Sequence, residues 1–473
     1  MKGANKAMNK LKKFQAGLTA ALFIFTAVSC SSSKKVSSSE QQTTTAEAVT
    51  QPTEQPTEKE FHAAETNEKM TLTWLGDYDL NPYGDEKKST ALSLFEDVYG
   101  GKINYHNSYA NERFTILEML LDSGETVDMF QYNTEILPYG INKGWFEPLD
   151  AYYEQLGMND GLWDDMTEII DSLEYNGGHY VIPYSLSEPF LLTYSRKTVQ
   201  AEGLEDPYTL YKSGEWTWDK FVNMMETFVS NAPAGVYRYG INGEFGEAAL
   251  TSTGHSVVNN ENGQLVNNID DEQIGKAEEL IQQITQKGLY RNNWIGHYAG
   301  DGSILFFAMD DWSLYDSNLA CPELDLMVVP FPKPANSDKY YNQCQYNARM
   351  LVKNSQKGEA VATYIKCERL AATDEKCRES AKNMALVSKA DGGFITSEQY
   401  DAIQEYLTPS SVFPKFDFAY GMGGGMYGVD SSNNGAPMNV LTTAMLYGTY
   451  GSWDSLRDAY RDVISGQIDK YNQ

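Results

Sequence analysis

Histidine is scarce in this sequence, and the motifs of the common hydrolases and nucleotide-binding enzymes are missing. The chain has five histidines, and no HExxH, GxSxG or P-loop motif accompanies them. Adjacent acids occur at 164–165, 270–271 and 310–311, but neighbouring residues of a strand point to opposite faces. The sequence therefore argues against catalysis, although carboxylate pairs leave a glycoside-cleaving enzyme as an alternative.

Basic residues are also few. The chain has 37 Lys and Arg against 65 Asp and Glu, for a formal net charge of −28. Residues 1–29 hold five of the lysines and no acid, so the net charge of the chain without them is −33. Such a surface repels phosphate backbones, which argues against nucleic acid as a partner.

Cysteine is the third scarce residue type, with five in the chain. Apart from Cys30, the cysteines are Cys321, Cys344, Cys367 and Cys377, and none has the CxxC spacing of a zinc site. In an exported chain they could form one or two disulfides, with Cys367–Cys377 the favoured pair, or equally serve as small buried apolar residues. We expect no metal and no cofactor.

A basic and then apolar segment opens the chain. Five lysines within residues 1–13 precede the stretch from Ala16 to Val28, which is too short to span a bilayer comfortably. The stretch closes with Ala27-Val28-Ser29-Cys30, which resembles the lipobox of bacterial lipoproteins. The resemblance implies a signal peptide over 1–29 and lipidation of Cys30, which would anchor the chain extracytoplasmically on the outer face of the cell membrane. An ordinary cleaved signal with an incidental cysteine is the alternative.

Residues 30–69 are composed mostly of Ser, Thr, Gln, Glu, Lys and Pro, with the tetrapeptide QPTE twice in succession from Gln51. A segment of this composition buries little, so we expect a disordered tether between Cys30 and a folded part that begins near Met70.

Strands and helices alternate at the start of the folded part. Met70–Asp77 and Lys102–Tyr109 are predicted strands, and a helical pattern lies between them at Lys88–Val98. A second helix follows Asn111 and ends at Gly124, before the apolar strand Val127–Tyr132. This order predicts an α/β fold with a mostly parallel sheet, whose ligand lies at the carboxyl ends of the strands.

Six segments carry a family resemblance. They are VDMFQY (127–132), GWFEPLD (144–150), NGGHYVIPY with LLTYSRKTV (176–199), EWTWDKFVNMMETF (215–228), ILFFAMDDWSLYD (304–316) and LDLMVVPFPKP (324–334). In this order and spacing, they resemble the carbohydrate-binding extracellular solute-binding proteins of ABC importers, the group that includes maltose-binding protein. The resemblance covers roughly residues 70 to 390.

The resemblance implies a two-lobe periplasmic-binding-protein-like fold with discontinuous lobes joined by hinge crossings. Lobe 1 would take 70–185 plus 326–372, and lobe 2 would take 190–325 plus 373–473 with the C-terminal helices. The crossings would lie near Pro183–Pro189 and Pro322–Pro330. The implied function is capture of a small-molecule solute, an oligosaccharide above all, by a non-catalytic monomer that delivers it to ABC permease subunits.

Aromatic rings cover the apolar faces of sugars, and acids and amides bind their hydroxyls. Residues of both kinds follow the predicted strands. The candidates for ligand binding are Trp74, Asp77, Tyr78, Tyr109, Glu112, Tyr132 and Asn133 in lobe 1, Tyr184 near the crossing, and Trp294, Asp310, Asp311 and Trp312 in lobe 2.

Some alternatives stay open at this stage. A peptide or other polar solute would suit the same fold, and a surface adhesin would account for the tether and the charge. The segment Gly421–Gly428 satisfies GxGxxG but lacks the strand-turn-helix context of a nucleotide site, so it is either a flexible loop or a flap over the ligand.

Overall fold

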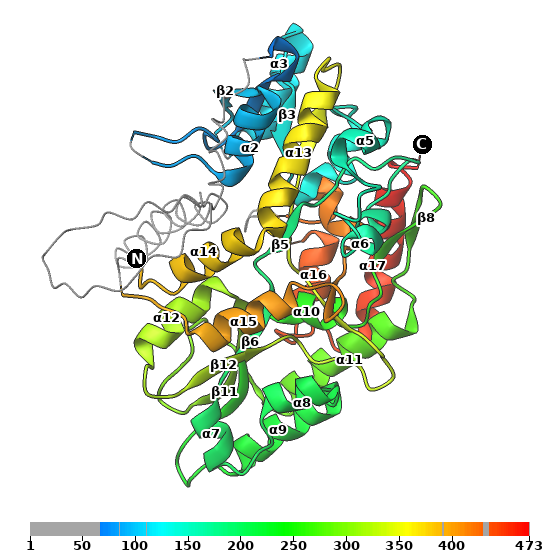
Figure 1. Ribbon diagram of the computed structural model, residues 1–473. Coiled ribbons are helices and arrows are strands. Elements are labelled where there is room, and N and C mark those ends of the chain that lie inside the picture. The colour runs from blue at the N-terminus through cyan, green and yellow to red at the C-terminus, as the bar shows by residue number, and fades with distance from the viewer. Residues whose placement is uncertain (1–66, 85, 110, 390–391, 429–434, 473) are drawn as a thin grey trace, which may run out of the picture.

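The computed structural model describes residues 67–472 except 85, 110, 390–391 and 429–434. The expected signal peptide, Cys30 and nearly all of the expected tether lie outside these residues. Two sheets stand at opposite ends of the molecule, and each is flanked by helices (Figure 1). Within the described residues, no helix is both long enough and apolar enough to cross a bilayer.

Lobe 1 is built on a five-stranded sheet of order β2-β1-β3-β15-β4. Strands β1, β2 and β3 are parallel, and β15 lies antiparallel between β3 and β4. The strands are β1 (Thr71–Gly76), β2 (Lys102–Asn107), β3 (Met129–Gln131), β4 (Phe146–Glu147) and β15 (Arg349–Val352). Its helices are α2 (Thr90–Tyr99), α3 (Arg113–Ser123), α4 (Tyr139–Asn142), α5 (Tyr153–Leu156), α6 (Thr167–Ser172) and α13 (Gly358–Thr373), with short 3-10 turns η2 (Glu68–Met70), η3 (Thr134–Ile136) and η4 (Asp150–Tyr152).

The predicted elements of lobe 1 form close to their expected bounds. Helix α3 ends at Gly124, which adopts the left-handed conformation with φ of 75°. Its N–H donates to the carbonyl oxygens of Leu120 and Leu121. The N-cap residue of α3 is Glu112 and not Asn111, so the helix begins one residue later than the sequence suggests. The α/β class predicted from the alternation of strands and helices is confirmed.

Lobe 2 has a second five-stranded sheet, of order β10-β7-β11-β6-β12. Its strands are β6 (Phe190–Ser195), β7 (Tyr239–Gly243), β10 (Tyr290–Arg291), β11 (Ile304–Asp310) and β12 (Leu326–Val329). The helices are α7 (Arg196–Ala201), α8 (Pro207–Ser213), α9 (Trp218–Ser230), α10 (Gly246–Thr251), α11 (Glu272–Gln286), α12 (Trp312–Ala320) and α15 (Ser397–Tyr406), and β8 (Val258–Glu261) and β9 (Gln264–Asn267) form a hairpin.

The core of lobe 2 is rich in aromatic rings. Phe306 on β11 lies with its ring centroid 5.8 Å from Trp216 and 5.1 Å from Phe221, and Phe221 lies 5.5 Å from Phe331. The Trp216 indole donates to the Pro330 carbonyl at 2.9 Å. Trp216 is fully buried and lies two residues before the start of helix α9.

The second crossing between the lobes differs from the expected one. Strand β12 pairs antiparallel with β6 in the lobe 2 sheet, so residues 326–329 do not return to lobe 1. The chain crosses later, where β14 (Gln345–Asn347) pairs antiparallel with β5 (Ser185–Ser187) of the first crossing. The second lobe 1 segment therefore begins near residue 348 and not at 326 as expected. The physical reason is that β12 is a fully apolar strand that is buried beside the equally apolar β6 in the lobe 2 sheet.

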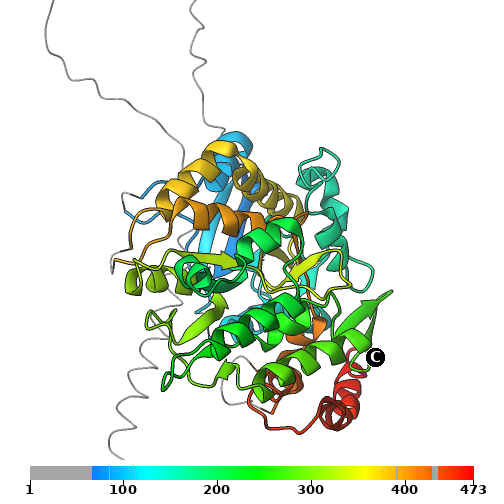
Figure 2. The same cartoon turned by 90° about the horizontal axis from the view of Figure 1, so that it is seen from below.

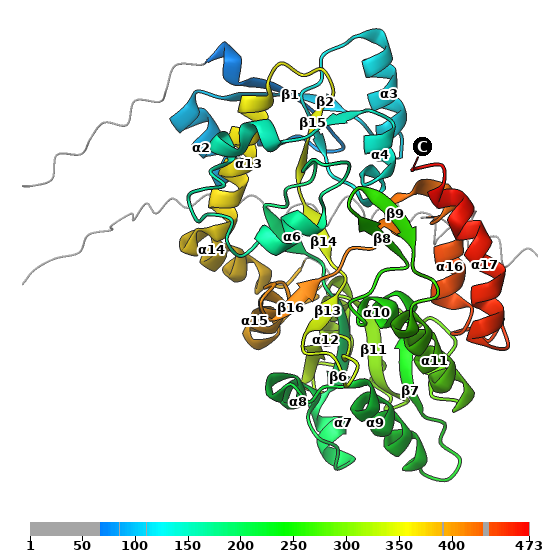
Figure 3. The ribbon, with the colours of Figure 1, turned by 90° about the vertical axis from the view of Figure 1, so that its right-hand side faces the viewer.

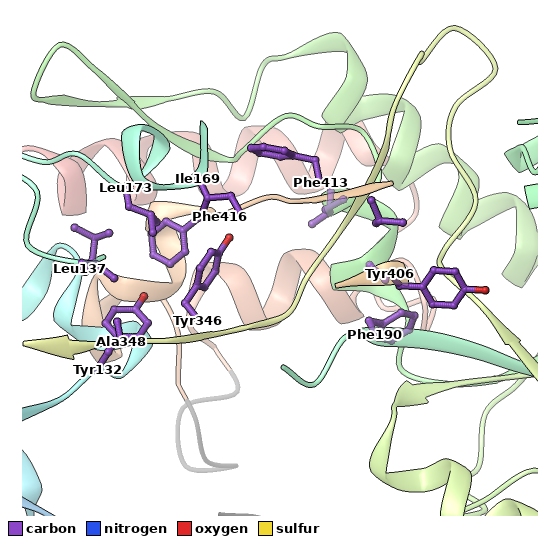
Figure 4. Packing of buried hydrophobic residues seen from close by; sticks show 14 of the residues in the cluster. Tyr132, Leu137, Ile169, Leu173, Phe190, Tyr346, Ala348, Tyr406, Phe413 and Phe416 are labelled. Carbon is purple, nitrogen blue, oxygen red and sulfur yellow. The ribbon is translucent and has the colours of Figure 1, made fainter. Parts of the chain in front are cut away.

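A third stretch of chain runs between the lobes. Strand β16 (Val412–Pro414) pairs parallel with β13 (Tyr340–Asn342) at the hinge, after α14 (Glu375–Ala385) has led away from lobe 1. Figure 3 shows β13, β14 and β16 between the two sheets. Buried side chains continue through this region, where the ring of Phe416 meets that of Tyr346 edge-on at 6.0 Å (Figure 4).

The C-terminal part packs on lobe 2 but touches lobe 1. It comprises η5 (Phe418–Gly421), η6 (Gly423–Gly425), α16 (Pro437–Thr443) and α17 (Trp453–Ile468). Figure 2, seen from below, places the C-terminal helices at one edge of the molecule beside the lobe 2 segments. The Asn142 side chain of α4 donates to the Tyr471 carbonyl at 3.3 Å, which ties the end of the chain to lobe 1.

The described cysteines form no disulfide, so the structure does not contain the Cys367–Cys377 pair. Cys321, Cys367 and Cys377 are buried and Cys344 is half-buried. The Cys377 sulfur lies 3.4 Å from the Thr90 hydroxyl. The alternative in which these residues serve as small apolar side chains agrees with their burial.

Candidate functional site

The carboxyl ends of the lobe 1 strands bring several candidate residues to one edge of the sheet. Asp77 follows β1 and is half-buried, and its Oδ1 has no hydrogen-bond partner among the described residues. Asn133 follows β3, and its side chain accepts from the Glu135 N–H at 3.1 Å. Tyr109, beyond β2, is 62% exposed and adopts a positive φ of 50°. Glu112 is exposed at the start of α3.

Three of the predicted aromatic ligand residues surround a guanidinium of the chain itself. The guanidinium carbon of Arg349, the first residue of β15, lies 4.8 Å from the Trp74 ring, 5.9 Å from Tyr78 and 5.5 Å from Tyr184. These three rings and Arg349 are here called the arginine cage. Arg349 also donates to the Tyr78 hydroxyl at 2.8 Å and to Glu368 on α13 at 2.9 Å.

The arginine cage includes Trp74 and Tyr184, whose predicted role in ligand binding stays a prediction. Trp74 is fully buried and Tyr184 is 4% exposed, so neither ring faces solvent in this conformation. The Trp74 indole donates to the Tyr78 carbonyl at 2.9 Å, and this bond holds the loop that follows β1. Trp74 therefore helps to position the loop of Asp77 and Tyr78, and the Tyr184 ring packs against the guanidinium of Arg349.

Tyr132 is buried as well, at 7% exposure, and its hydroxyl has no hydrogen-bond partner among the described residues. Figure 4 shows it beside Ala348, at the point where the chain re-enters lobe 1. Burial raises the pKa of the Tyr132 hydroxyl, so it stays neutral. Tyr132 therefore packs where the chain re-enters lobe 1, and its role in ligand binding stays a prediction.

Four carboxyl groups gather at the lobe 2 side of the crossing. Asp310 ends β11, Asp311 is the N-cap residue of α12, Glu188 lies in the β5–β6 link with φ of 49°, and Glu247 lies in the first turn of α10. They are half-buried, and each interacts electrostatically with at least one of the others. They are here called the acidic group.

Burial and mutual repulsion raise the pKa values of the acidic group. The pKa of Asp310 is about 7, chiefly because of burial and then because of the charges on Asp311 and Glu188. The pKa of Asp311 is also about 7, from burial and the Glu188 charge. Burial and the Asp310 and Asp417 charges bring the pKa of Glu247 to about 8. Raised carboxyl pKa values in a recess are frequent at functional sites.

This arrangement makes folding stability depend on pH. An acid whose pKa rises on folding holds its proton more tightly in the folded state, so stability falls as pH increases from about 4 to about 7. Asp310→Asn removes this contribution, and we expect the variant to be more stable than wild type by about 1–2 kcal/mol at pH 8. Urea unfolding at pH 4 and pH 8 measures the difference, which should vanish at pH 4.

The exposed Asp122→Asn on α3 serves as the matched control, with no expected difference at either pH. A gain for Asp310→Asn that is the same at pH 4 and pH 8 would contradict the raised pKa.

The glycine-rich C-terminal segment supplies residues that sequence reasoning missed. The Asp417 carboxylate accepts from the N–H groups of Val257 at 2.6 Å, Val258 at 3.0 Å and Ala419 at 2.9 Å, which fixes the segment against β8. Tyr420 then stands beside Glu247, and its hydroxyl slightly opposes the rise in the pKa of that carboxyl. The many tyrosines and glycines of residues 418–428 mark the segment as unusual in the sequence, but they do not indicate that Tyr420 lies beside Glu247.

Residues 418–428 contain two short 3-10 turns with buried residues and not an open loop, and a role as a flap over the ligand stays a prediction. Phe418, Ala419, Gly421 and Gly423 are buried, and a Cβ on Gly421 would lie 1.7 Å from the Leu137 carbonyl oxygen. The segment therefore packs directly against η3 of lobe 1.

The two tryptophan candidates of lobe 2 differ in their surroundings. Trp312 begins α12 next to Asp311 and is half-buried, so it lies in the acidic group's immediate neighbourhood. Trp294 is 55% exposed, and its ring lies 5.8 Å from Phe307, which belongs to a second and smaller apolar cluster. The structure therefore brings Trp312, Asp310 and Asp311 together, and it places Trp294 on a different cluster.

Two mixed α/β lobes, several crossings of the chain and polar groups at the carboxyl ends of the strands define a two-lobed binding protein. Residues 51–366 match the family model of the bacterial extracellular solute-binding proteins, and the chain belongs to this family. The family consists of non-catalytic substrate-binding proteins of ABC transporters, which sets the glycosidase alternative aside.

Solved structures of sugar-binding proteins share the fold. One is the galacto-N-biose/lacto-N-biose I-binding protein of an ABC transporter from Bifidobacterium longum, with 14% identity over 85% of this chain and 97% of that chain and a TM-score of 0.57. Another is the sugar-binding protein MalE from Xanthomonas citri, with 14% identity over 85% and 98% and a TM-score of 0.58. A comparison with curated protein sequences found no significant match.

Proposed function

We propose that this protein is a lipid-anchored receptor that captures an oligosaccharide between its lobes and delivers it to the permease subunits of an ABC importer. The observation that carries the proposal is the acidic group, which lies with Trp312 at the edge of the lobe 2 sheet where β7 and β11 end and β6 begins. The described carboxylates can accept hydrogen bonds from sugar hydroxyls, and the ring can cover an apolar sugar face.

Lobe 1 would contribute Asp77 and Asn133 from the facing strand ends, with Tyr78 held in place by the arginine cage. The buried Oδ1 of Asp77 supports this role, because an unpartnered carboxylate oxygen is costly unless a ligand or water satisfies it. Tyr109 and Glu112 are exposed beyond β2, where they could close over a bound ligand. Three neighbours of similar fold were solved with lacto-N-biose, cycloalternan and maltotetraose, which favours a glycan over a peptide.

A thermal-shift screen of the purified protein against oligosaccharides, peptides and amino acids tests the receptor function. A ligand that binds only the folded state stabilises it by about 2.7 kcal/mol at a hundredfold excess over Kd. We expect a shift with one oligosaccharide series, reduced for the double substitution Asp310→Asn/Asp311→Asn and retained for Asp122→Asn. A shift with peptides alone would contradict the proposal that the ligand is an oligosaccharide. No shift with any solute would count against the receptor function.

The anchor is tested separately at Cys30. Cells that express the chain and receive radiolabelled palmitate should label the wild-type protein and its Cys344→Ala variant at the membrane. Cys30→Ala should lose both the label and the membrane association. Label that persists in Cys30→Ala would contradict lipidation at this position.

A further inference from the structure

A crevice with a volume of about 280 Å³ lies between the two lobes, beside the β8–β9 hairpin. Asp171, Ser172 and Glu174 line it from lobe 1, at the end of α6 and just after it. Three asparagines of the hairpin line it from lobe 2, and β16 with the chain that follows it forms the third wall. The lining residues include none of the candidates for the main cleft, so the crevice is a separate feature of the fold.

One hydrogen bond joins the lobes at this crevice. The Asn260 side chain donates to the Glu174 carbonyl oxygen at 2.7 Å, and its own amide oxygen accepts from the Gly263 N–H at 2.9 Å. Asn259 and Asn262 are the other two asparagines of the hairpin wall, and their side chains make no hydrogen bond with the described residues. Their amide groups are therefore available to a ligand, both as donors and as acceptors.

The third wall holds a lysine without a counter-ion. Lys415 is half-buried, and among the described residues no carboxylate oxygen lies within 4.0 Å of its ammonium group. Burial lowers the pKa of Lys415, and the charge of Asp417 opposes this effect only in part. The Asp417 carboxylate already accepts from three backbone N–H groups. A half-buried ammonium group in these surroundings favours an anion from outside the chain.

The lobe 1 wall carries charge of the opposite sign. The Asp171 Oδ1 lies 3.8 Å from the His179 Nε2, and Glu174 forms no salt bridge with the described residues. Since neither acid pairs with Lys415, the crevice presents a positive group on one wall and negative groups on another. A simple anion would be repelled by these acids and by the net charge of −28, whereas a molecule with both charges suits both walls.

Phenylalanine rings supply the apolar part of the lining. Phe413, Phe416 and Phe418 are buried, and the rings of Phe416 and Phe418 meet edge-on with their centroids 5.2 Å apart. Figure 4 shows Phe413 and Phe416 on the same stretch of chain. Pockets for drug-sized ligands measure about 300–1,000 Å³, so the volume of this crevice suits a smaller molecule, of the size of one amino acid.

We propose that this crevice is a second binding site, and that it takes a free α-amino acid with an apolar side chain. The carboxylate of the amino acid pairs with Lys415 and accepts from the hairpin amides, and its ammonium group faces Asp171 and Glu174. Its side chain lies against the phenylalanine rings. Because the crevice shares no residue with the main cleft, the proposal does not depend on the solute that the cleft binds.

The test is isothermal titration of the full-length chain, purified in detergent, with L-leucine, L-phenylalanine, L-leucinamide and N-acetyl-L-leucine at pH 7. Leucinamide lacks the carboxylate, and N-acetylleucine lacks the ammonium group. Each therefore loses one charge-assisted interaction, and we expect both to bind about tenfold more weakly than leucine or worse.

Substitutions locate the bound amino acid. Lys415→Met should weaken leucine binding by about tenfold or more, and Lys415→Arg should restore most of it because the charge returns. Lys102→Met, at an exposed lysine of β2, is the matched control and should bind leucine as the wild type does. Asp310→Asn/Asp311→Asn in the main cleft should also keep leucine binding. Melting curves of each variant check the fold.

Each other outcome contradicts part of the assignment. Leucine binding that survives Lys415→Met would place the amino acid elsewhere on the protein and overturn the site. N-acetylleucine that binds as tightly as leucine would contradict a ligand with both charges, and leucinamide that does so would contradict the pairing with Lys415. If neither leucine nor phenylalanine binds, the second site is overturned, and the receptor function is still decided by its own screen.

Discussion

Replacing Glu368 by alanine should lower the free energy of unfolding by about 3–5 kcal/mol, because it leaves the guanidinium of Arg349 buried without its carboxylate. The side chains of the pair are 3% and 6% exposed, so water cannot replace the lost partner. The Tyr78 hydroxyl still accepts from Arg349, but a hydroxyl does not neutralise a charge. Urea unfolding at pH 7 measures the loss.

The control for this substitution is an ion pair of the same chemistry on the surface. Arg196 donates to Glu398 at 2.8 and 2.6 Å, yet the two side chains are 26% and 56% exposed. Glu398→Ala should cost no more than about 1 kcal/mol. Equal losses for the two variants would show that the arginine cage does not depend on its buried charge pair.

Replacing Gly421 by alanine should be nearly as damaging, by about 3 kcal/mol or more, and should also move the lobes apart. The new Cβ would lie 1.7 Å from the Leu137 carbonyl oxygen and 2.7 Å from that of Thr134. Both contacts are with backbone, so no side-chain rotation relieves them. The C-terminal segment must separate from lobe 1, and small-angle scattering should show a larger radius of gyration.

Gly435 provides the matched control, because no atom of the residues that the structure describes lies within 4 Å of the position that its Cβ would take. Gly435→Ala should change the stability by less than about 0.5 kcal/mol and leave the scattering curve unchanged. If Gly421→Ala had equally little effect, the contact between η5 and η3 would not contribute to the stability or to the relative position of the lobes.

Local patterns predicted the elements well. The left-handed glycine at 124 ends α3 as expected, and the strands predicted at 70–77 and 102–109 form as β1 and β2. The surroundings of the aromatic candidates were harder to predict, because Trp74 and Tyr78 contact Arg349, which lies far away in the sequence. A tryptophan after a strand looks the same in sequence whether it faces a ligand or a guanidinium.

The lobe boundary shows the same limit. A buried apolar strand such as 326–329 suits either sheet, and only its pairing with β6 decides that it belongs to lobe 2. The acidic group was half predicted: Asp310 and Asp311 follow a recognisable strand, whereas Glu188 and Glu247 come from segments whose pattern indicates nothing about their neighbours. Their meeting depends on how the chain crosses between the lobes.

The Asn142 side chain of lobe 1 donates a hydrogen bond to the Tyr471 carbonyl, so the position of residues 471–472 should change when the lobes separate. The Asn472 side chain is at the same time fastened to Leu265 of the β8–β9 hairpin by two hydrogen bonds, of 2.9 and 2.8 Å. Any rotation of one lobe against the other must therefore stretch or release this short bridge. An environment-sensitive dye at position 471 would read out closure from outside the cleft, without competing with the solute.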